Sequence, residues 1–181
     1  MQKIAVLLAP GFEEVEAAAP IDVLRRLGFQ VQVAGLDGLE VTGAHGLACK
    51  ADCLLSQIPA KDLAAVVLPG GLPGAHHLRD SAAVIALVQE VHAAGHLVAA
   101  ICAAPLVLGK AGLLKGKKFT CYPSVETQLP EGIHSGARTT RDGQILTGKG
   151  AGAAIEFGLA IGAALGKEVE AKKLRVGMIV D

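Results

Sequence analysis

Cys102 is the residue of this sequence best placed to do chemistry. It follows a strongly apolar run at residues 97–101, and a helical pattern begins directly after it. A side chain on such a sharp strand-to-helix turn is exposed at the top of a sheet, as nucleophiles are in many hydrolases. The unpaired amides and positive dipole of a helix N-terminus would favour the thiolate. The alternative is a small buried cysteine without chemistry, the commonest role of a free cysteine.

Two glycines form the second group with chemical potential. Gly70 and Gly71 follow Pro69 after the apolar run at residues 62–68. Because they have no side chain, their backbone could approach a ligand closely and donate N–H groups to a developing oxyanion. The simpler interpretation is a plain turn between a strand and a helix.

Three glutamates form the third group. Glu13, Glu14 and Glu16 lie in the first turn of an expected helix, where acidic residues usually complement the helix dipole and do nothing more. A carboxyl beside the Cys102 thiolate would, however, form a like-charge pair. One of the two groups would then hold a proton, and the pKa of the carboxyl would rise toward the range useful for acid–base catalysis.

The elements that must position these groups alternate along the chain. Apolar runs typical of buried strands are separated by patterns with helical spacing. Strands are expected at residues 3–9, 30–35, 62–68 and 96–101, with short strands between 40 and 55, and helices at 13–27, 82–94 and 106–111. This alternation predicts an α/β fold with a doubly wound, mostly parallel sheet and helices on both faces.

The second half of the chain adds a small hairpin. A strand is expected at residues 117–121, and strands near 137–140 and 144–147 are joined by an Asp-Gly turn. A helix rich in small residues is expected at 150–165, and the charged stretch 167–175 fits a solvated helix face. No repeat or linker interrupts the pattern, so residues 1–181 are predicted to form a single domain.

The candidate groups should meet at one edge of the sheet. In doubly wound sheets, ligands bind beyond the carboxyl ends of the strands. The loops at 9–16, 69–74, 101–105 and 120–123 each follow an apolar strand. The sequence therefore predicts that the thiol, the glutamates and the glycines share one pocket.

Composition narrows the classes of function. Of 181 residues, 51% are hydrophobic and 19% charged, which excludes a disordered chain and suits one folded domain. Seventeen basic and seventeen acidic residues cancel, and the aromatic residues are four Phe and one Tyr. Because neither a basic surface nor an aromatic platform is indicated, nucleic acid is not expected to be the main partner.

The cysteines and the apolar runs bear on location. The four cysteines are well spread, and no second Cys or His pair completes a zinc ligand set. Reduced thiols of this kind are typical of a cytoplasmic protein. No apolar run reaches transmembrane length, and residues 1–16 fit a strand leading into a helix better than a signal peptide. A cytoplasmic protein without a membrane partner is therefore expected.

Four segments stand in an order that points to a family. They are Ala-Pro-Gly-Phe-Glu-Glu-Val-Glu at 9–16, Val-Leu-Pro-Gly-Gly at 67–71, Ala-Ala-Ile-Cys-Ala-Ala-Pro at 99–105 and Leu-Thr-Gly-Lys-Gly-Ala-Gly at 146–152. Together they resemble the ThiJ/PfpI superfamily, and the whole chain is similar to its Parkinson-associated deglycase branch. The resemblance implies a flavodoxin-like fold, a homodimer, and neither a metal nor an organic cofactor.

The resemblance also implies roles and substrates. Cys102 would be the reactive nucleophile and Glu16 its protonated carboxyl partner and general acid–base. Backbone amides of Gly71 and Ala103, with Gly70 beside them, would form an anion pocket. The implied activity is a glutathione-independent glyoxalase or protein deglycase that acts on methylglyoxal, glyoxal or their early adducts on amino acids and proteins during oxidative and carbonyl stress.

The sequence departs from this branch at three pocket positions. Tyr122 stands where the branch often has His, while His45 and Lys149 stand where it has Arg. Tyrosine cannot serve as a base at neutral pH as His can, and bidentate anion binding by an Arg fork is weakened. Arg26, with Arg25 before it, is implied to lie near the subunit contact and the pocket.

Two other functions remain open. Cys102 could act without catalysis, as a redox sensor or chaperone in which oxidation to a sulfinate changes partner binding. A cysteine peptidase is the least favoured, because Ala103 occupies the place of the His that directly follows the cysteine in the peptidase branch.

Other residues are interpreted as structural. Cys121 ends a strand beside the expected pocket and is favoured as core packing over a second redox-active thiol. His76 and His77 point apart on a helix and fit a solvated helix end better than a metal pair. The glycine-rich segment at 148–152 lacks the Lys-Ser/Thr of a P-loop, so no nucleotide site is expected there.

Overall fold

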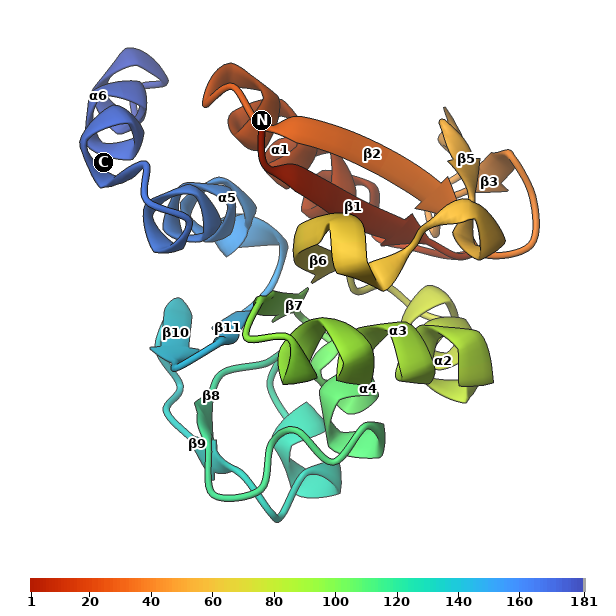
Figure 1. Ribbon diagram of the computed structural model, residues 1–181. Coiled ribbons are helices and arrows are strands. Elements are labelled where there is room, and N and C mark those ends of the chain that lie inside the picture. The colour runs from red at the N-terminus through yellow and green to blue at the C-terminus, as the bar shows by residue number, and fades with distance from the viewer. Residues whose placement is uncertain (181) are drawn as a thin grey trace.

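The computed structural model describes residues 1–180 and has the predicted α/β architecture (Figure 1). In this part of the chain, a seven-stranded sheet has the order β10-β11-β7-β6-β1-β2-β5. Its strands are β1 (Lys3–Leu8), β2 (Gln30–Gly35), β5 (Cys53–Leu54), β6 (Leu63–Leu68), β7 (Leu97–Ile101), β10 (Thr139–Asp142) and β11 (Ile145–Gly148). Neighbouring strands are parallel except β10 and β11, which form the predicted antiparallel hairpin.

Helices cover both faces of this sheet. Figure 1 shows α1 and α5 next to each other on one side of the strands, with α2, α3 and α4 on the other. The helices are α1 (Glu14–Arg26), α2 (Gly74–Asp80), α3 (Ala82–Ala93), α4 (Pro105–Lys110), α5 (Ala154–Ala164) and α6 (Glu168–Gly177). The sandwich of helices around a parallel sheet is the flavodoxin-like arrangement expected from the sequence.

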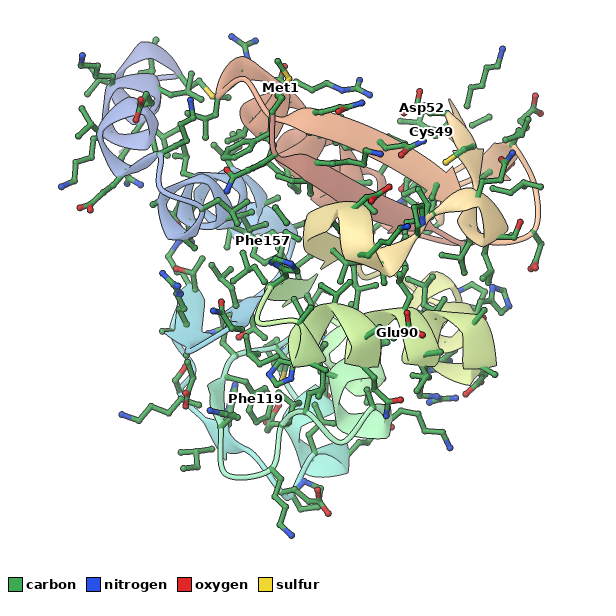
Figure 2. All side chains as sticks on the ribbon, in the orientation of Figure 1. Met1, Cys49, Asp52, Glu90, Phe119 and Phe157 are labelled. Atoms are coloured by element: carbon green, nitrogen blue, oxygen red, sulfur yellow. The ribbon has the colours of Figure 1, made fainter. Side chains whose placement is uncertain are left out.

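Strand β1 shows how the two cores form. Ile4, Val6 and Leu8 pack in the cluster shared with α1 and α5, whereas Ala5 and Leu7 pack in the cluster shared with α3 and α4. This alternation is the period-two pattern of a strand whose two faces are both buried. The labelled Phe157 in Figure 2 lies in the first of these cores, between α5 and the sheet.

Small residues set the distance between α1 and α5, the two helices on one face of the sheet. A Cβ on Gly158 of α5 would lie 3.1 Å from the Cα of Pro20 and 3.0 Å from the Cβ of Val23, both in α1. Because such a contact is tighter than ordinary van der Waals packing, only glycine lets the two helices approach this closely. The abundance of glycine in the sequence is thus used partly for layer packing.

Two small sheets lie at the ends of the large one. Strands β3 (Glu40–Thr42) and β4 (Ala48–Lys50) form an antiparallel hairpin, and β8 (Lys118–Phe119) pairs in parallel with β9 (Ile133–His134). Short 3₁₀ helices complete the chain: η1 (Leu55–Gln57), η2 (Ala60–Asp62), η3 (Val125–Gln128) and η4 (Ala151–Ala153).

Two predicted elements have different bounds. The strand expected at 117–121 is only Lys118–Phe119, because the amide of Thr120 donates to the hydroxyl of Thr147 at 2.8 Å instead of to a strand. The helix expected at 150–165 begins at Ala154, after the 3₁₀ turn η4. The Ser81 side chain accepts a hydrogen bond from the Val84 amide, as expected of an N-cap.

Within residues 1–180, no helix is both long enough and apolar enough to cross a bilayer.

Candidate active site

Cys102 occupies a sharp turn at the carboxyl end of β7. Its φ of 63° lies in the left-handed region, where a residue with a side chain is strained by about 1–3 kcal/mol. Two hydrogen bonds hold it there: its amide donates to the Gly148 carbonyl at 3.0 Å, and its carbonyl accepts from the Tyr122 amide at 2.9 Å. The half-buried thiol is therefore presented at the sheet edge by neighbouring strands.

Glu16 reaches this turn from the first turn of α1. Its side chain is only 1% exposed, and its Oε2 accepts a hydrogen bond from the Gly70 amide at 3.0 Å. The Gly70 carbonyl in turn accepts from the Glu13 amide at 2.9 Å. The start of α1 is thus bonded to the loop after β6, and this fixes the carboxyl at the strand ends.

Gly70 is the point where the two chemical groups meet. A Cβ at this position would lie 2.6 Å from Oε2 of Glu16 and 2.7 Å from the Cβ of Cys102. Real Cβ atoms do not approach other atoms so closely. The absence of a side chain at Gly70 is therefore what allows the carboxyl and the thiol to share one small space.

Burial changes the acid–base properties of both groups. Desolvation raises the pKa of Glu16 from 4.5 to about 7, although hydrogen bonds with Cys102 and Gly70 act in the opposite direction. Desolvation, together with the charge of Glu16 and its hydrogen bond, raises the pKa of Cys102 to about 12. The site therefore accommodates one negative charge, and the pair shares one proton around neutral pH.

This differs from the sequence-based expectation that a helix N-terminus makes Cys102 a thiolate. The helix after it, α4, begins only at Pro105, and burial beside a carboxyl dominates over the helix end. The partial compensation comes from two individual amides, because hydrogen bonds from the backbone of Gly71 and Ala103 lower the pKa of the thiol. Negative charge on the sulfur therefore depends on where the shared proton lies.

The loop carrying Gly71 is also closely packed. Gly71 has a φ of 88°, and a Cβ there would collide with the backbone of Phe12 and Glu13. Its carbonyl accepts the Ala75 amide at 2.9 Å, at the start of α2. The Gly71 amide is thereby held toward Cys102 on a rigid support, with the Ala103 amide next in the chain after the cysteine.

His45 lies on the loop between β3 and β4 and contacts the glutamates at the start of α1. Its amide donates to Oε1 of Glu14 at 2.7 Å, and its Nδ1 lies 2.9 Å from Oε2 of Glu14 and 3.5 Å from Oε2 of Glu13. The hydrogen bond with Glu14 is the main cause that raises the pKa of the exposed His45 imidazole. His45 therefore supplies a cation beside the site when it is protonated.

Glu14 has a role that sequence reasoning missed. Burial raises its pKa, but hydrogen bonds from the His45 ring and from the amides of His45 and Leu47 outweigh it and bring the pKa to about 2. The carboxylate is thus a permanent anchor for the β3–β4 loop. The only sequence signal was its place among three glutamates, which does not indicate which one faces a loop 30 residues away.

Tyr122 and Lys149 adjoin the Cys102 backbone: the Tyr122 amide donates to the Cys102 carbonyl, and Lys149 follows Gly148, whose carbonyl accepts from the Cys102 amide. Together with Arg138 and the η4 backbone they line a hollow of about 310 Å³. The Lys149 Nζ donates to the Gly136 carbonyl at 3.2 Å, whereas the Tyr122 ring is exposed. Arg138, which the sequence analysis did not single out, is held by Glu156 and adds a guanidinium to this hollow.

Arg26 does not reach the pocket of its own chain. It lies ten residues after Glu16 on α1, which is about 15 Å along the helix axis. Its Nε bonds Asp22 at 2.7 Å on the exposed surface. Any part that Arg26 plays at a pocket therefore requires a second chain.

The arrangement can perform nucleophilic chemistry with proton transfer. A half-buried thiol, a carboxyl that titrates near neutrality and two amides aimed at the sulfur lie together at one sheet edge. His77, by contrast, lies on α2, and its Nδ1 is 3.0 Å from the Pro10 carbonyl. The carboxyl–thiol pair is consequently the chemical centre of this edge.

Comparison with known proteins places this geometry in context. The chain matches the sequence profile of the DJ-1/PfpI family over residues 2–164. It is 39% identical over 178 residues to Protein dj-1beta of Drosophila melanogaster, covering 97% of this chain and 95% of that protein. It is 37% identical over 165 residues to the Parkinson disease protein 7 homolog of Danio rerio, covering 88% and 87%.

Solved structures give the same result. The crystal structure of Drosophila melanogaster DJ-1beta superimposes with a TM-score of 0.94 at 38% identity, over 99% of this chain and 98% of that one. Toxoplasma gondii DJ-1 in an oxidized form has a TM-score of 0.94, also at 38% identity with coverage of 99% and 98%. The likeness extends over the whole chain and includes the sheet edge that carries Cys102.

Proposed function

The chain belongs to the DJ-1/PfpI family, and from this premise we propose that it is a cysteine-dependent enzyme that converts methylglyoxal, glyoxal or their early protein adducts without glutathione. The observation that carries the proposal is the proximity of the Glu16 carboxyl to Cys102, which is possible because Gly70 between them has no side chain. A small dicarbonyl suits this space, because it needs one nucleophile and one group that can give and take protons.

The reaction begins with attack of the Cys102 sulfur on the aldehyde carbon. The thiol proton passes to the substrate oxygen by way of Glu16, and a hemithioacetal forms. The Glu16 carboxylate then removes the proton from that carbon and returns it to the neighbouring carbon, through an enediol. The product is a thioester of a hydroxy acid, which water hydrolyses to free lactate from methylglyoxal and to regenerate the thiol.

Two amides support the charged stages. The amides of Gly71 and Ala103 bond the sulfur in the resting site, and a negative oxygen formed next to that sulfur comes within their reach. Preorganised backbone donors of this type are worth about 10²–10³ in rate for each donor. A Glu16 pKa of about 7 suits the carboxyl to both halves of the proton transfer.

The direct test measures lactate from methylglyoxal in buffer without glutathione. Wild-type protein and Cys49→Ser should form lactate at similar rates, because Cys49 lies on β4 and has no role in the proposed mechanism. Cys102→Ser should abolish formation, and Glu16→Gln should reduce turnover by at least about 100-fold, since it removes the proton carrier. Lactate formation that survives in Cys102→Ser would overturn the proposed mechanism.

A second function is favoured by one observation. The half-buried Cys102 sulfur is bounded by amide donors and a protonatable carboxyl, which would also stabilise the sulfinate formed by peroxide. A relative of 38% identity was solved in an oxidized form. As a redox sensor, the protein should gain two oxygens on Cys102 in mild peroxide, by intact and peptide mass. Oxidation confined to other cysteines would reject this role.

We also propose a homodimer that closes over the site. Val15 and Leu47 are 52% and 65% exposed, and both flank the buried Glu14 on α1 and the β3–β4 loop. A second copy covering this apolar surface would bring its own residues, such as Arg26, near the pocket. The free state of all four cysteines supports a reducing, cytoplasmic location.

A further inference from the structure

We propose that Cys121, Glu126 and His134 bind a divalent cation of the zinc class at a site separate from Cys102. One potential ligand atom from each residue, the Cys sulfur, a Glu oxygen and a His ring nitrogen, lies within 4.8 Å of the other two. These are the three donor types most often found around zinc. The proposal does not depend on the activity proposed for Cys102.

Strand pairing brings two of the ligands together. In the parallel pair β8–β9, Phe119 lies opposite His134, and their rings are 5.6 Å apart between centroids. Cys121 follows Phe119 by two residues, just beyond the end of β8, and both side chains pack in the same core cluster. The labelled Phe119 in Figure 2 marks this region, below the large sheet.

The third ligand comes from the turn that follows. The chain reverses at residues 122–124 and enters η3, where Glu126 projects back toward the cysteine. The Cys121 sulfur donates a hydrogen bond to Oε2 of Glu126 at 3.8 Å. Glu126 and His134 are eight residues apart in the sequence, and both lie next to the buried Cys121 thiol.

The distances suit a tetrahedral ion. With metal–sulfur bonds of about 2.3 Å and metal–nitrogen or metal–oxygen bonds of about 2.0 Å, neighbouring ligand atoms lie about 3.5 Å apart. The Cys121–Glu126 separation of 3.8 Å already approaches this value. Side-chain rotation of the exposed His134 can close the remaining distance, and water would fill the fourth position.

Charge also favours a cation at this place. A thiol that coordinates a divalent ion loses its proton outright. One thiolate and one carboxylate would then neutralise the ion, and neutral His134 would supply a third donor. Within residues 1–180, the His134 side chain has no hydrogen-bond partner that would compete.

The site is distinct from the catalytic pair. Cys121 packs in the core cluster that faces α3 and α4, whereas Cys102 packs against the cluster that faces α1 and α5. The two thiols therefore pack against different core clusters, and none of the three proposed ligands belongs to the carboxyl–thiol pair. This also separates metal binding from oxidation of the catalytic thiol.

A second group of ligand types is less suitable. Glu13, Glu14 and His45 also cluster within 4.8 Å. However, the Glu14 carboxylate already accepts hydrogen bonds from the His45 ring and two amides that fix the β3–β4 loop. A metal there would have to displace these bonds, whereas at Cys121 it would replace one long thiol–carboxylate contact.

The test titrates metal-free protein with Zn²⁺ in competition with a chromophoric chelator. Wild type, Cys102→Ser and Cys53→Ser should each bind one ion per chain; Cys53 is the matched control because it is also a buried free thiol. Cys121→Ser, Glu126→Gln and His134→Gln should each bind at least about 100-fold more weakly. Co²⁺ should give a thiolate-to-metal absorption band that is absent in Cys121→Ser.

Several results would overturn the site. Absence of a bound equivalent in wild type would do so, as would binding that is lost in Cys102→Ser and retained in Cys121→Ser. His134→Gln is the deciding variant if Cys121→Ser does not fold, because His134 is exposed and its replacement leaves the core intact. Unchanged Zn²⁺ affinity in folded His134→Gln, checked by circular dichroism, would reject the proposed ligand set.

Discussion

The Gly70 amide donates a hydrogen bond to Oε2 of Glu16 at 3.0 Å, and a Cβ on the same glycine would lie 2.6 Å from that oxygen. The residue that orients the carboxyl is thus also the one that leaves room for it. Cys102 lies on the other side of the space that a Gly70 side chain would fill. The contact between the carboxyl and the thiol therefore depends on Gly70, which has no reactive group. Activity should therefore be more sensitive to Gly70 than to many residues nearer solvent.

Gly70→Ala should damage the site more than the fold. The added methyl group must displace Glu16 or Cys102, and a displacement of about 1 Å in a catalytic group costs about 100-fold in rate. Overpacking should lower the free energy of unfolding by about 1–3 kcal/mol. Lactate formation and urea unfolding measure the two effects.

The matched control is Gly177→Ala at the end of α6, where a Cβ would meet nothing within 4 Å. This variant should keep full activity and gain up to about 1 kcal/mol from helix propensity. Equal activities of Gly70→Ala and Gly177→Ala would show that the contact is not needed.

The shared proton should be visible in the reactivity of Cys102. In wild type, burial and the neighbouring Glu16 carboxylate raise the pKa of Cys102 to about 12, so alkylation by iodoacetamide should be slow at neutral pH and rise only in alkaline solution. Glu16→Gln removes the charge and the hydrogen bond of Glu16 that help to raise this pKa. The midpoint should therefore move downward by at least about one pH unit. Peptide mass spectrometry resolves Cys102 from the other thiols, and an unchanged midpoint would contradict a coupled pair.

Glu16 should also make stability depend on pH. Its pKa is raised from 4.5 in the unfolded chain to about 7 in the fold, so the folded protein binds a proton more tightly. The contribution is complete below pH 4.5 and is lost as the pH rises through 7. A shift of this size corresponds to about 3 kcal/mol.

Urea unfolding of wild type and Glu16→Gln at pH 4.5 and pH 8 isolates this contribution, because other groups are common to both proteins. The variant should gain about 3 kcal/mol relative to wild type at the higher pH. The surface variant Glu90→Gln should differ from wild type by no more than about 0.5 kcal/mol at either pH. A pH-independent difference for Glu16→Gln would place the carboxyl in a solvated environment.

The sheet and most helices could be predicted from the sequence because burial leaves a strong periodic signal. Apolar runs gave β1, β6 and β7, and the Ser81 cap and Val84 stripe gave α3. The short strand β8 was predicted too long because the Thr120 amide turns to the Thr147 hydroxyl, a partner 27 residues away. Such a choice between local and distant hydrogen bonds leaves no pattern in the local sequence.

The candidate site was predictable in its residues but not in its electrostatics. Motif order and the turn after β7 indicated Cys102 and Glu16, yet the helix-dipole argument favoured a thiolate where burial raises the pKa instead. The proximity of Glu126 and His134 to Cys121 also left no signal, because it arises across a turn and matches no paired Cys or His spacing. Both features depend on distances through space.

Leu47 provides the test of the proposed dimer. It is 65% exposed on the β3–β4 loop, and its amide donates to the Glu14 anchor, so the fold displays this apolar side chain at a fixed position beside the site. Leu47→Asp places a charge in the proposed interface, where desolvation of an unpaired carboxylate costs several kcal/mol. The variant should therefore elute as a monomer in size-exclusion chromatography with light scattering, while wild type elutes as a dimer. Val176→Asp on α6 is the control, because Val176 is 79% exposed and lies outside this surface. If Leu47→Asp stays dimeric, the subunit contact lies elsewhere on the protein. If wild type is monomeric, the proposed dimer does not form. In either case no second chain covers the pocket at this surface.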